Sequence, residues 1–236
     1  MLPLIQRPPL LLSIIVPLAP DETERLVLLQ QLADLPNSCE IILVRAGSES
    51  LRAPPDWPDH LGFVECLSPQ GRARQMNVGA QAARGRWLWF LHADSQLSAA
   101  VLPALLDFIR HDEEALGYFK LSFRGDGPWL TRLNAWGANR RALWLKLPFG
   151  DQGFVLPAAT FRELGGYDEE ASYGEDHLLV WALRGKAVPL VRLDATLATS
   201  ARKYARKGWL ATTLRHWRLT FTQAWGAWRR LHREAH

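Results

Sequence analysis

The sequence predicts an α/β fold: an open, mainly parallel sheet with helices on both faces. Two observations indicate this fold. Short β-branched or leucine-rich runs alternate with helical patterns over the first hundred residues. The run at 86–91 is apolar on both faces, as a central parallel strand must be. At 236 residues the chain is long enough to bury a substantial core.

Apolar spacing and capping residues predict the individual elements. In the first half, strands are expected at 11–16, 40–44, 62–66 and 86–91, and helices at 21–35 and 70–84. Asp21 is the expected N-cap of the first helix, and Gly85 ends the second. In the second half, strands are expected at 116–124, 153–156 and 187–193, and helices at 128–145, 158–164 and 175–184.

Tryptophan and basic residues are concentrated in the second half. Eight of the eleven Trp residues lie after residue 125, on segments that also carry Arg or Lys. These residue types together are typical of interfaces. A change of composition near Ser200 predicts a domain of residues 1–200 followed by a basic, Trp-rich helical tail of residues 201–236.

The tail carries nine Arg and Lys against one acidic residue, Glu234, which indicates an anionic partner. Its apolar residues recur every three or four positions and predict one amphipathic helix: Leu210, Leu214, Trp217, Phe221, Ala224, Trp228 and Leu231. This stripe fits a helix packed on its own domain or on a second copy, or one lying on an anionic membrane, and the pattern leaves these open. No nucleic-acid-reading module is present, so nucleic acid is not expected as a partner.

The cysteines and the N-terminal run bear on the compartment. Cys39 and Cys66 lie in or beside apolar runs without metal-ligand spacing, which predicts reduced thiols of a cytoplasmic protein. The run "PLLLSIIVPLAP" has an apolar core of about ten residues that is broken by prolines, so it does not fit a signal peptide or a membrane span.

Several polar residues lie where a parallel sheet places ligands. The strand at 86–91 runs directly into His92, Ala93 and Asp94, and ligands of such sheets bind outside the carboxyl ends of the strands. Asp94 fits two roles: the cap of a following helix, or a ligand of Mg²⁺ or Mn²⁺ beside a phosphorylated compound.

Three further segments carry polar groups with an open role. "GRARQMN" at 71–77 opens a helix, and its first-turn amides and two arginines suit a diphosphate better than a bare basic turn, which would oppose the helix dipole. The segment Gly150-Asp151-Gln152-Gly153 fits a plain turn or a polar site. Glu175 and Asp176 stand at a helix start, where acidic residues are expected in any case.

Taken together, the order and spacing of these segments resemble the family 2 glycosyltransferases of the GT-A fold. The similarity covers about residues 11–204 and is carried by "SIIVPLAPDE", "EIILVRAGSES", "GRARQMNVGAQAARG", "WFLHADSQL", "GDQGFVLPAATFRELGGYDE" and "GEDHLLVWALRGKAV". The spellings "FLHAD", "GDQG" and "SARKY" are most similar to the subgroup called radical-SAM/selenodomain-associated transferases. The resemblance implies a metal-dependent, inverting transfer of a sugar from a nucleotide-sugar donor to an acceptor hydroxyl.

The resemblance also implies roles for individual residues. Asp94 takes the metal position, for Mn²⁺ or Mg²⁺, and Asp176, or else Glu175, takes the position of the general base. The acceptor side comprises Gly150, Asp151 and Gln152. The donor side comprises Pro17, Arg45, Arg72, Arg74, Asn77, His92, Ala93, Arg202 and Lys203. A lipid-linked acceptor would connect this activity with a membrane-bound tail at the inner face of the membrane.

Two positions depart from the family's pattern. Arg45 stands where the second strand commonly ends in an Asp that holds the nucleotide base, and an Arg cannot accept a hydrogen bond from a base N–H. His92 stands where many relatives have a second metal-binding carboxylate. These departures leave a second hypothesis open: a degenerate transferase fold that serves as a membrane-binding or protein-binding module. Nucleotidyl transfer is disfavoured because "PLAPDETER" lacks a Gly-rich, Lys-containing loop.

Overall fold

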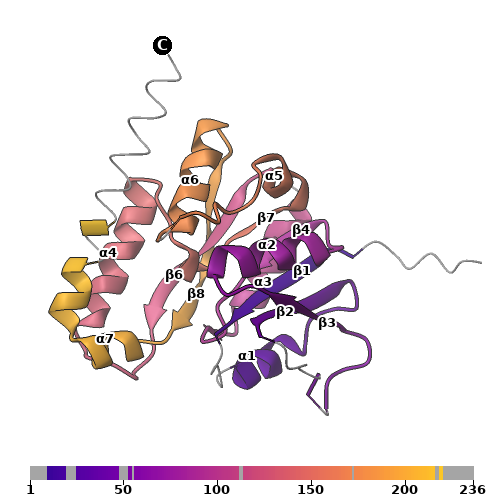
Figure 1. Cartoon of the computed structure of the whole chain (residues 1–236), viewed down its shortest axis with the longest axis horizontal. Coiled ribbons are helices and arrows are strands. Elements are labelled where there is room, and N and C mark those ends of the chain that lie inside the picture. Colours follow the sequence, from indigo (N-terminus) through magenta and orange to yellow (C-terminus); the bar gives the residue numbers. More distant parts are fainter. Residues whose placement is uncertain are drawn as a thin grey trace, which may run out of the picture.

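The structure is a computed structural model that describes residues 10–19, 25–47, 53–54, 56–111, 114–171, 173–215 and 218–219 (Figure 1). Its strands are β1 (Leu12–Leu18), β2 (Cys39–Ala46), β3 (Gly62–Ser68), β4 (Trp87–Phe90), β5 (Gln96–Leu97), β6 (Leu116–Phe123), β7 (Val155–Pro157) and β8 (Leu190–Thr199). Its α-helices are α1 (Arg25–Leu32), α2 (Arg72–Ala82), α3 (Val101–His111), α4 (Thr131–Trp144), α5 (Ala158–Glu163), α6 (Glu175–Gly185) and α7 (Arg202–Lys207). A short 3₁₀ helix, η1, spans Gly150–Gln152.

The strands of the described part form one sheet in the order β3-β2-β1-β4-β7-β6-β8-β5. The first four strands in this order pair in parallel, and β7 then runs antiparallel to both β4 and β6. Beyond β7, β6 and β8 are parallel, and the two-residue β5 closes the edge antiparallel to β8. The predicted fold class, a mainly parallel α/β sheet, is therefore confirmed.

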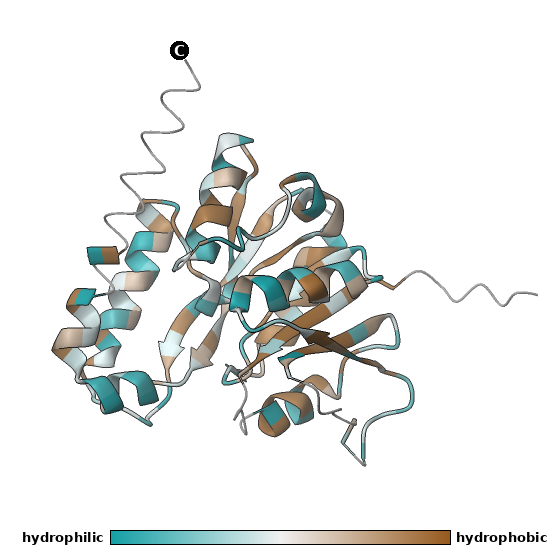
Figure 2. Cartoon of the chain, viewed as in Figure 1, coloured by the Kyte–Doolittle hydropathy of each residue, from teal (hydrophilic) through white to brown (hydrophobic). Residues whose placement is uncertain are grey.

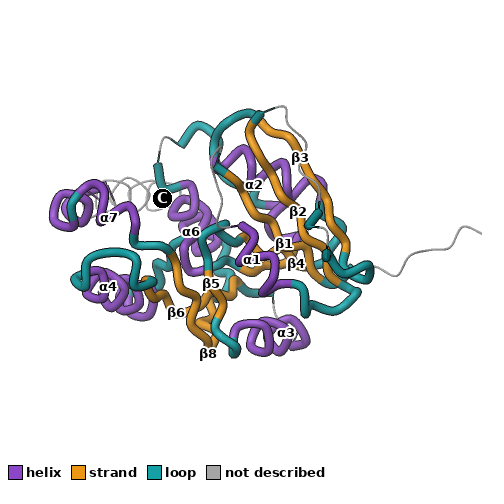
Figure 3. Tube along the Cα trace, turned by 90° about the horizontal axis from the view of Figure 1, so that it is seen from below, coloured by secondary structure: helices purple, strands orange, loops and turns teal. Residues whose placement is uncertain are grey.

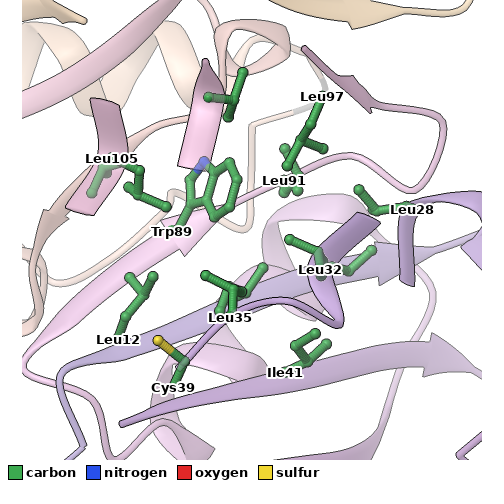
Figure 4. Close-up of a cluster of buried hydrophobic side chains, with 14 of the residues drawn as sticks. Leu12, Leu28, Leu32, Leu35, Cys39, Ile41, Trp89, Leu91, Leu97 and Leu105 are labelled. Atoms are coloured by element: carbon green, nitrogen blue, oxygen red, sulfur yellow. The ribbon is translucent and has the colours of Figure 1, made fainter. Parts of the chain in front are cut away.

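Helices cover both faces of the sheet and enclose two apolar cores (Figure 3). On one face, leucines of α1 and α3 pack against inward side chains of β1, β2 and β4, and Figure 4 shows Leu28, Leu32 and Leu105 around Trp89. On the other face, residues of α2, α5 and α6 pack against alternate residues of the same strands. Since both faces are covered, the central strands are buried throughout, which explains the continuous apolar run at 87–90.

Three elements differ from the sequence-based expectation. Helix α3 was not predicted; Pro103 lies in its first turn, where a missing N–H costs no hydrogen bond, and Val101, Leu105 and Phe108 form its buried face. The edge strand β5 is too short to give a period-two pattern. Strand β8 begins at Leu190 rather than at residue 187 and continues six residues beyond the predicted end, to Thr199.

The beginning of the basic tail packs on the body of the protein. The hydroxyl of Ser200 and the N–H of Ala201 donate hydrogen bonds to the Asp126 carboxylate, and the Tyr204 ring meets Phe123 edge-on at 5.4 Å. Residues 209–215 are helical, as the stripe predicts. The stripe residues from Trp217 onward and the N-cap Asp21 lie outside the described residues, so the division at residue 200 stays a prediction.

Two further expectations concern the thiols and the membrane. Cys39 and Cys66 are both free, and Cys39 is buried in the core. Within the described ranges, no helix combines the length and the apolar character needed to cross a bilayer.

Candidate active site

A cavity of about 350 Å³ opens at the carboxyl ends of β1, β2 and β4. It is lined by Pro17, Leu18, Ala19, Ala46, Gln70, Gly71, Arg72, Gln75, His92, Ala93 and Asp94. Five of the predicted site residues are among them: Pro17, Arg72, His92, Ala93 and Asp94. Its size and its position at the mouth of a parallel sheet are typical of a small-molecule site.

Helix α2 supplies the floor of this cavity. The amide of the Gln75 side chain donates to the carbonyls of Leu18 and Val44, both at 2.8 Å, and so joins the ends of β1 and β2. Gly71, with a φ of 143°, makes the turn into the helix, and no side chain caps the helix there. The first-turn N–H groups of α2 are therefore available to an anionic ligand, where the helix dipole favours negative charge.

Arg72 connects this floor to the start of α6 and to the residue that follows β4 and Leu91. Its guanidinium contacts the His92 imidazole and forms an ion pair with Glu175, with Nε 3.3 Å from Oε1. Burial, and then the Arg72 cation, hold the pKa of His92 well below its usual range. The imidazole is therefore neutral at physiological pH and accepts a hydrogen bond from the guanidinium through Nε2.

Asp94 presents the carboxylate that ends the central strand segment. The Thr199 hydroxyl, at the end of β8, donates to Asp94 Oδ1 at 3.3 Å. In the described ranges, no three His, Cys, Asp or Glu side chains gather closely enough to hold a metal ion. The residues present therefore do not form a metal centre made by the protein alone, but one carboxylate in the cavity fits a Mg²⁺ or Mn²⁺ ion that completes its coordination with diphosphate oxygens and water.

A wall formed by η1 and the start of α6 adjoins the cavity at Arg72, although none of its residues is in the cavity lining. Asp176 accepts a hydrogen bond from the Gly150 N–H through Oδ2 and one from the His177 N–H through Oδ1. A Cβ at Gly150 would lie 2.7 Å from Arg72 Nη2 and 2.9 Å from Asp176 Oδ2. A side chain at position 150 would therefore displace the Arg72 guanidinium and the Asp176 carboxylate from their present positions.

Asp151 is a buried carboxyl group of this wall whose negative charge is incompletely compensated. Its Oδ1 is buried without a hydrogen-bond partner among the residues that the structure describes. Burial raises the pKa of Asp151 from 3.8 to about 6; the nearby Arg141 guanidinium opposes the shift, and the Asp176 carboxylate adds to it. Burial likewise raises the pKa of Glu175, with Arg72 opposing and Asp176 reinforcing the shift. The wall thus contains two carboxyl groups, Asp151 and Glu175, whose pKa values are raised by burial.

With this geometry in view, comparison with known proteins decides the family. The model of glycosyl transferase family 2 matches residues 13–163, more than half of the chain. The chain belongs to glycosyl transferase family 2. The matched region contains the whole cavity lining as well as Gly150 and Asp151.

Solved structures agree on the fold. Residues 1–349 of TarS from S. aureus match with a TM-score of 0.61 at 18% identity, over 81% of this chain and 60% of that chain. The same TarS fragment in complex with UDP-GlcNAc matches at 0.61 and 20% identity, over 81% and 58%, and in complex with UDP at 0.61 and 19%, over 81% and 61%. The chain thus spans about three fifths of these TarS chains. A comparison with curated proteins finds no match.

Not every predicted residue of the family 2 site lies in the cavity. The Asn77 amide donates to the Tyr167 carbonyl and the Glu169 carboxylate and accepts from the Tyr167 N–H, so it fastens α2 to the loop after α5. The buried Gln152 amide donates to the Phe119 carbonyl and accepts from the Phe149 N–H. Both side chains support the walls of the site from outside the cavity lining.

The predicted basic residues are distributed around the site. Arg74 pairs with Glu169 and Glu170, at 3.6 and 3.9 Å, outside the cavity lining. Arg45 precedes Ala46, which lines the cavity, at the end of β2. Arg202 donates to the Ser200 hydroxyl at the start of α7.

Lys203 lies close enough to Arg72 and Asp151 to interact with both. Burial lowers the pKa of Lys203, as do the cations Lys207, Arg215 and Arg72, whereas Asp151 raises it. Helix α7 therefore borders the same wall.

Some site residues were missed from the sequence. Thr199 was missed because the predicted last strand ended at residue 193; the alternating burial of Leu193, Ala195, Leu197 and Thr199 is the signal that extends it. Arg141 and Tyr204, which interact electrostatically with Asp151, come from α4 and α7. No local pattern could place them there, because only the fold brings these helices together.

Proposed function

We propose that the chain transfers a hexosyl group from a nucleoside-diphosphate sugar to an acceptor hydroxyl. The observation that carries this proposal is the cavity lined by Asp94, Arg72 and the uncapped start of α2, which adjoins at Arg72 the wall that holds Asp176. Family membership supports it. TarS has been solved with UDP-GlcNAc and with UDP, so a UDP-sugar is the first candidate donor for this chain.

The proposed reaction is a single displacement that inverts the anomeric carbon. The acceptor oxygen attacks that carbon, its bond to the diphosphate breaks, and the acceptor proton passes to Asp176. Each Asp176 oxygen accepts one backbone N–H and keeps a lone pair for this proton. We assign the base to Asp176 rather than Glu175, because Glu175 is paired with Arg72.

The departing diphosphate is stabilised by the same groups that bind the donor. The α2 amides and the Arg72 guanidinium lie at one end of the cavity and donate hydrogen bonds to its oxygens. A Mn²⁺ or Mg²⁺ ion shared by Asp94 and the diphosphate would neutralise the charge that develops on the leaving group. We place the reaction in the cytoplasm.

A thermal-shift screen with nucleoside diphosphates and Mn²⁺ tests the proposal, because a ligand that binds the native state raises its apparent stability. We expect at least one nucleotide to stabilise the protein more strongly with Mn²⁺ than without it. Asp94→Ala should remove the metal-dependent part, and Asp107→Ala, an exposed carboxylate on α3, serves as the matched control. A folded protein that no nucleotide stabilises, with or without Mn²⁺, would overturn the proposal.

The second candidate is a binding module without catalysis, which Arg45 and the neutral His92 favour. An assay for free nucleoside diphosphate released from the sugar nucleotide distinguishes the transferase from the binding module. Donor binding without any such release, in water or with added acceptor hydroxyls, would support the binding module.

A further inference from the structure

Helix α4 exposes an aromatic and basic face. Trp129, just before the helix, and Leu133, Trp136, Arg140 and Trp144 recur every three or four residues, so they lie on one side of the helix. The Trp129, Trp136 and Trp144 side chains are 74%, 60% and 65% exposed. The buried residues of α4 are a separate set: Thr131, Ala135 and Ala142. Since large apolar side chains are costly in water, an exposed face of this kind indicates a contact surface.

Arg140 is held inside this aromatic face. Its guanidinium carbon lies 5.2 Å from the centroid of Trp136 and 4.6 Å from that of Trp144. The stacking fixes a positive charge at the level of two indole rings. A partner for this face must therefore accept both aromatic rings and a cation at the same depth.

The helical segment 209–215 lies beside α4 and extends the surface (Figure 1). The Asn134 amide donates to the Thr213 hydroxyl at 3.0 Å and accepts from the Trp209 indole N–H. On this segment Leu210 and Leu214, four residues apart, are both exposed. Figure 2 shows hydrophilic and hydrophobic stretches mixed over α4 and its neighbour.

The charge of the two segments has one sign. Helix α4 carries three Arg and the segment 209–215 carries one, and neither contains Asp or Glu. With their flanking residues, the ranges 128–146 and 201–219 contain ten Arg and Lys and again no Asp or Glu. An anionic partner is therefore electrostatically complementary. Among anionic partners, exposed Trp and Leu side chains with flanking Arg and Lys match the headgroup level of a bilayer, where indole rings and basic side chains are both favoured.

We propose that α4 and the segment 209–215 form a docking surface for an anionic lipid bilayer. The sequence pattern offered only the tail for such a contact and left a second copy equally open. A second copy would bring two faces of the same charge together. The chain's own residues 221–236 carry three Arg against one Glu, so they too would add positive charge. Only an anionic partner neutralises this surface.

The surface adjoins the candidate active site. Arg141 of α4 and Lys203 of α7 both interact electrostatically with Asp151. The Arg141 guanidinium also lies 3.5 Å from the centroid of Phe149, the residue before η1, so a bilayer on the exposed face would lie across α4 from the wall that holds Asp176, which suits an acceptor hydroxyl carried by a lipid. The docking itself does not depend on the proposed transfer, because it can be measured without donor or acceptor.

Vesicle sedimentation of the full chain tests the proposal. We expect binding to phosphatidylcholine vesicles that contain phosphatidylglycerol and much weaker binding to phosphatidylcholine alone. Trp136→Glu with Trp144→Glu should weaken the binding about tenfold or more, since it replaces two interfacial rings by anions. Leu26→Glu and Leu67→Glu, exposed leucines on α1 and β3, are the matched controls and should bind as the wild type does.

Several outcomes would overturn the docking surface. The first is that the wild-type protein does not bind anionic vesicles. The second is that the α4 variant still binds them, whereas a variant with Trp225→Glu and Trp228→Glu does not. A wild-type dimer in light scattering that the α4 variant breaks would assign the face to a second copy. Displacement from the vesicles by a short oligonucleotide, with equal loss of oligonucleotide binding in the α4 variant, would assign it to nucleic acid. Thermal unfolding checks that the variants fold, and their stabilisation by nucleotides reports the donor site separately.

Discussion

Buried carboxyl groups at the two ends of the sheet differ in how fully they are hydrogen-bonded. At the amino ends of the strands, Glu40 is fully buried, accepts hydrogen bonds from the Ser13 hydroxyl and the Arg84 N–H, and forms a two-bonded pair with the Arg84 guanidinium. At the carboxyl ends, Asp151 has a buried oxygen without a partner and stands near two further carboxylates, Asp94 and Asp176.

The contrast separates structural from chemical carboxyl groups. A buried carboxylate whose oxygens are all bonded stabilises the fold and has little capacity left for a ligand. Neighbouring carboxyl groups that lack enough hydrogen bonds and cations repel one another and lower the stability of the fold. Such groups are typical of active sites and binding sites. Variants of the two ends should therefore fail differently, one in folding and the other in catalysis.

Asp176→Asn should give the largest functional effect. An amide cannot take the acceptor proton, and loss of a general base typically costs about 10²- to 10⁴-fold in rate. Nucleotide affinity should change little, whereas the melting temperature should fall modestly, because the amide oxygen can accept from only one of the two backbone N–H groups that Asp176 binds. Transfer rates and nucleotide titrations on the same preparations check this, with Asp107→Asn as the control. Unchanged turnover would mean that Asp176 is not the base.

Glu40→Ala should give the largest loss of stability. It leaves the Ser13 hydroxyl and the Arg84 N–H without their acceptor and removes the ion pair, which we expect to cost about 3 to 5 kcal/mol. Urea unfolding measures the loss. Ser13→Ala removes one bond to the same carboxylate and leaves the Gly85 N–H without its acceptor, but it should cost less because the ion pair with Arg84 remains. Folded Glu40→Ala protein should still bind nucleotide, and an equal loss of binding and of stability would contradict the division between the two ends.

Asp151→Asn should stabilise the protein, but only above acidic pH. The pKa of Asp151 is about 6 in the folded state, above the ordinary 3.8, so the folded state binds more protons between these values. Its ionisation therefore lowers stability as pH rises from about 4 to about 6, by at most about 3 kcal/mol. The variant should melt higher than the wild type at pH 7 and equally at pH 4.

Asp126→Asn is the matched control for that experiment and should have the opposite sign. Burial alone would raise the pKa of Asp126, but the hydrogen bonds from Ser200 and Ala201 and the Arg124 charge outweigh it, so the pKa is lowered. Its ionised form stabilises the fold at pH 7, and this stability is lost as pH falls through the folded-state pKa. If Asp151→Asn lowered the melting temperature at pH 7, the Asp151 carboxyl would be compensated by contacts other than those described.

The parallel half of the fold could be predicted because its signals are local. Each strand from β1 to β4 is an apolar run, and Gly71 marks the start of α2. The predicted C-cap Gly85 was wrong: α2 ends at Ala82 with Ala83 as its C-cap, and Gly85 instead packs directly against the backbone of Ser13. From strand order alone, Asp94 and the start of α2 had to meet at the carboxyl edge, and they do line one cavity.

The wall formed by η1 and the start of α6 could be predicted only in part. Asp151 and Asp176 stood out as polar residues at turns, but their proximity depends on the antiparallel insertion of β7 between β4 and β6, which no short-range pattern encodes. The same holds for Thr199 on Asp94 and for Asn77 in the loop after α5. Donors and acceptors in these contacts come from elements about 90 residues or more apart, so their pairing is a property of the fold.

The two arginines of α2 give the smallest and sharpest test, because the sequence assigned both to the donor diphosphate. Arg72 lines the cavity, whereas Arg74 pairs with Glu169 and Glu170 outside it. A hydrogen bond to a charged group contributes about 1.5 to 3 kcal/mol, so Arg72→Ala should weaken nucleotide binding about 10- to 100-fold. Arg74→Ala should change it less than about twofold, since a half-exposed ion pair adds little. Calorimetric titration of both variants decides the matter: equal losses would show that the donor extends beyond the cavity towards α5, and the catalytic end would then be wider than its lining residues indicate.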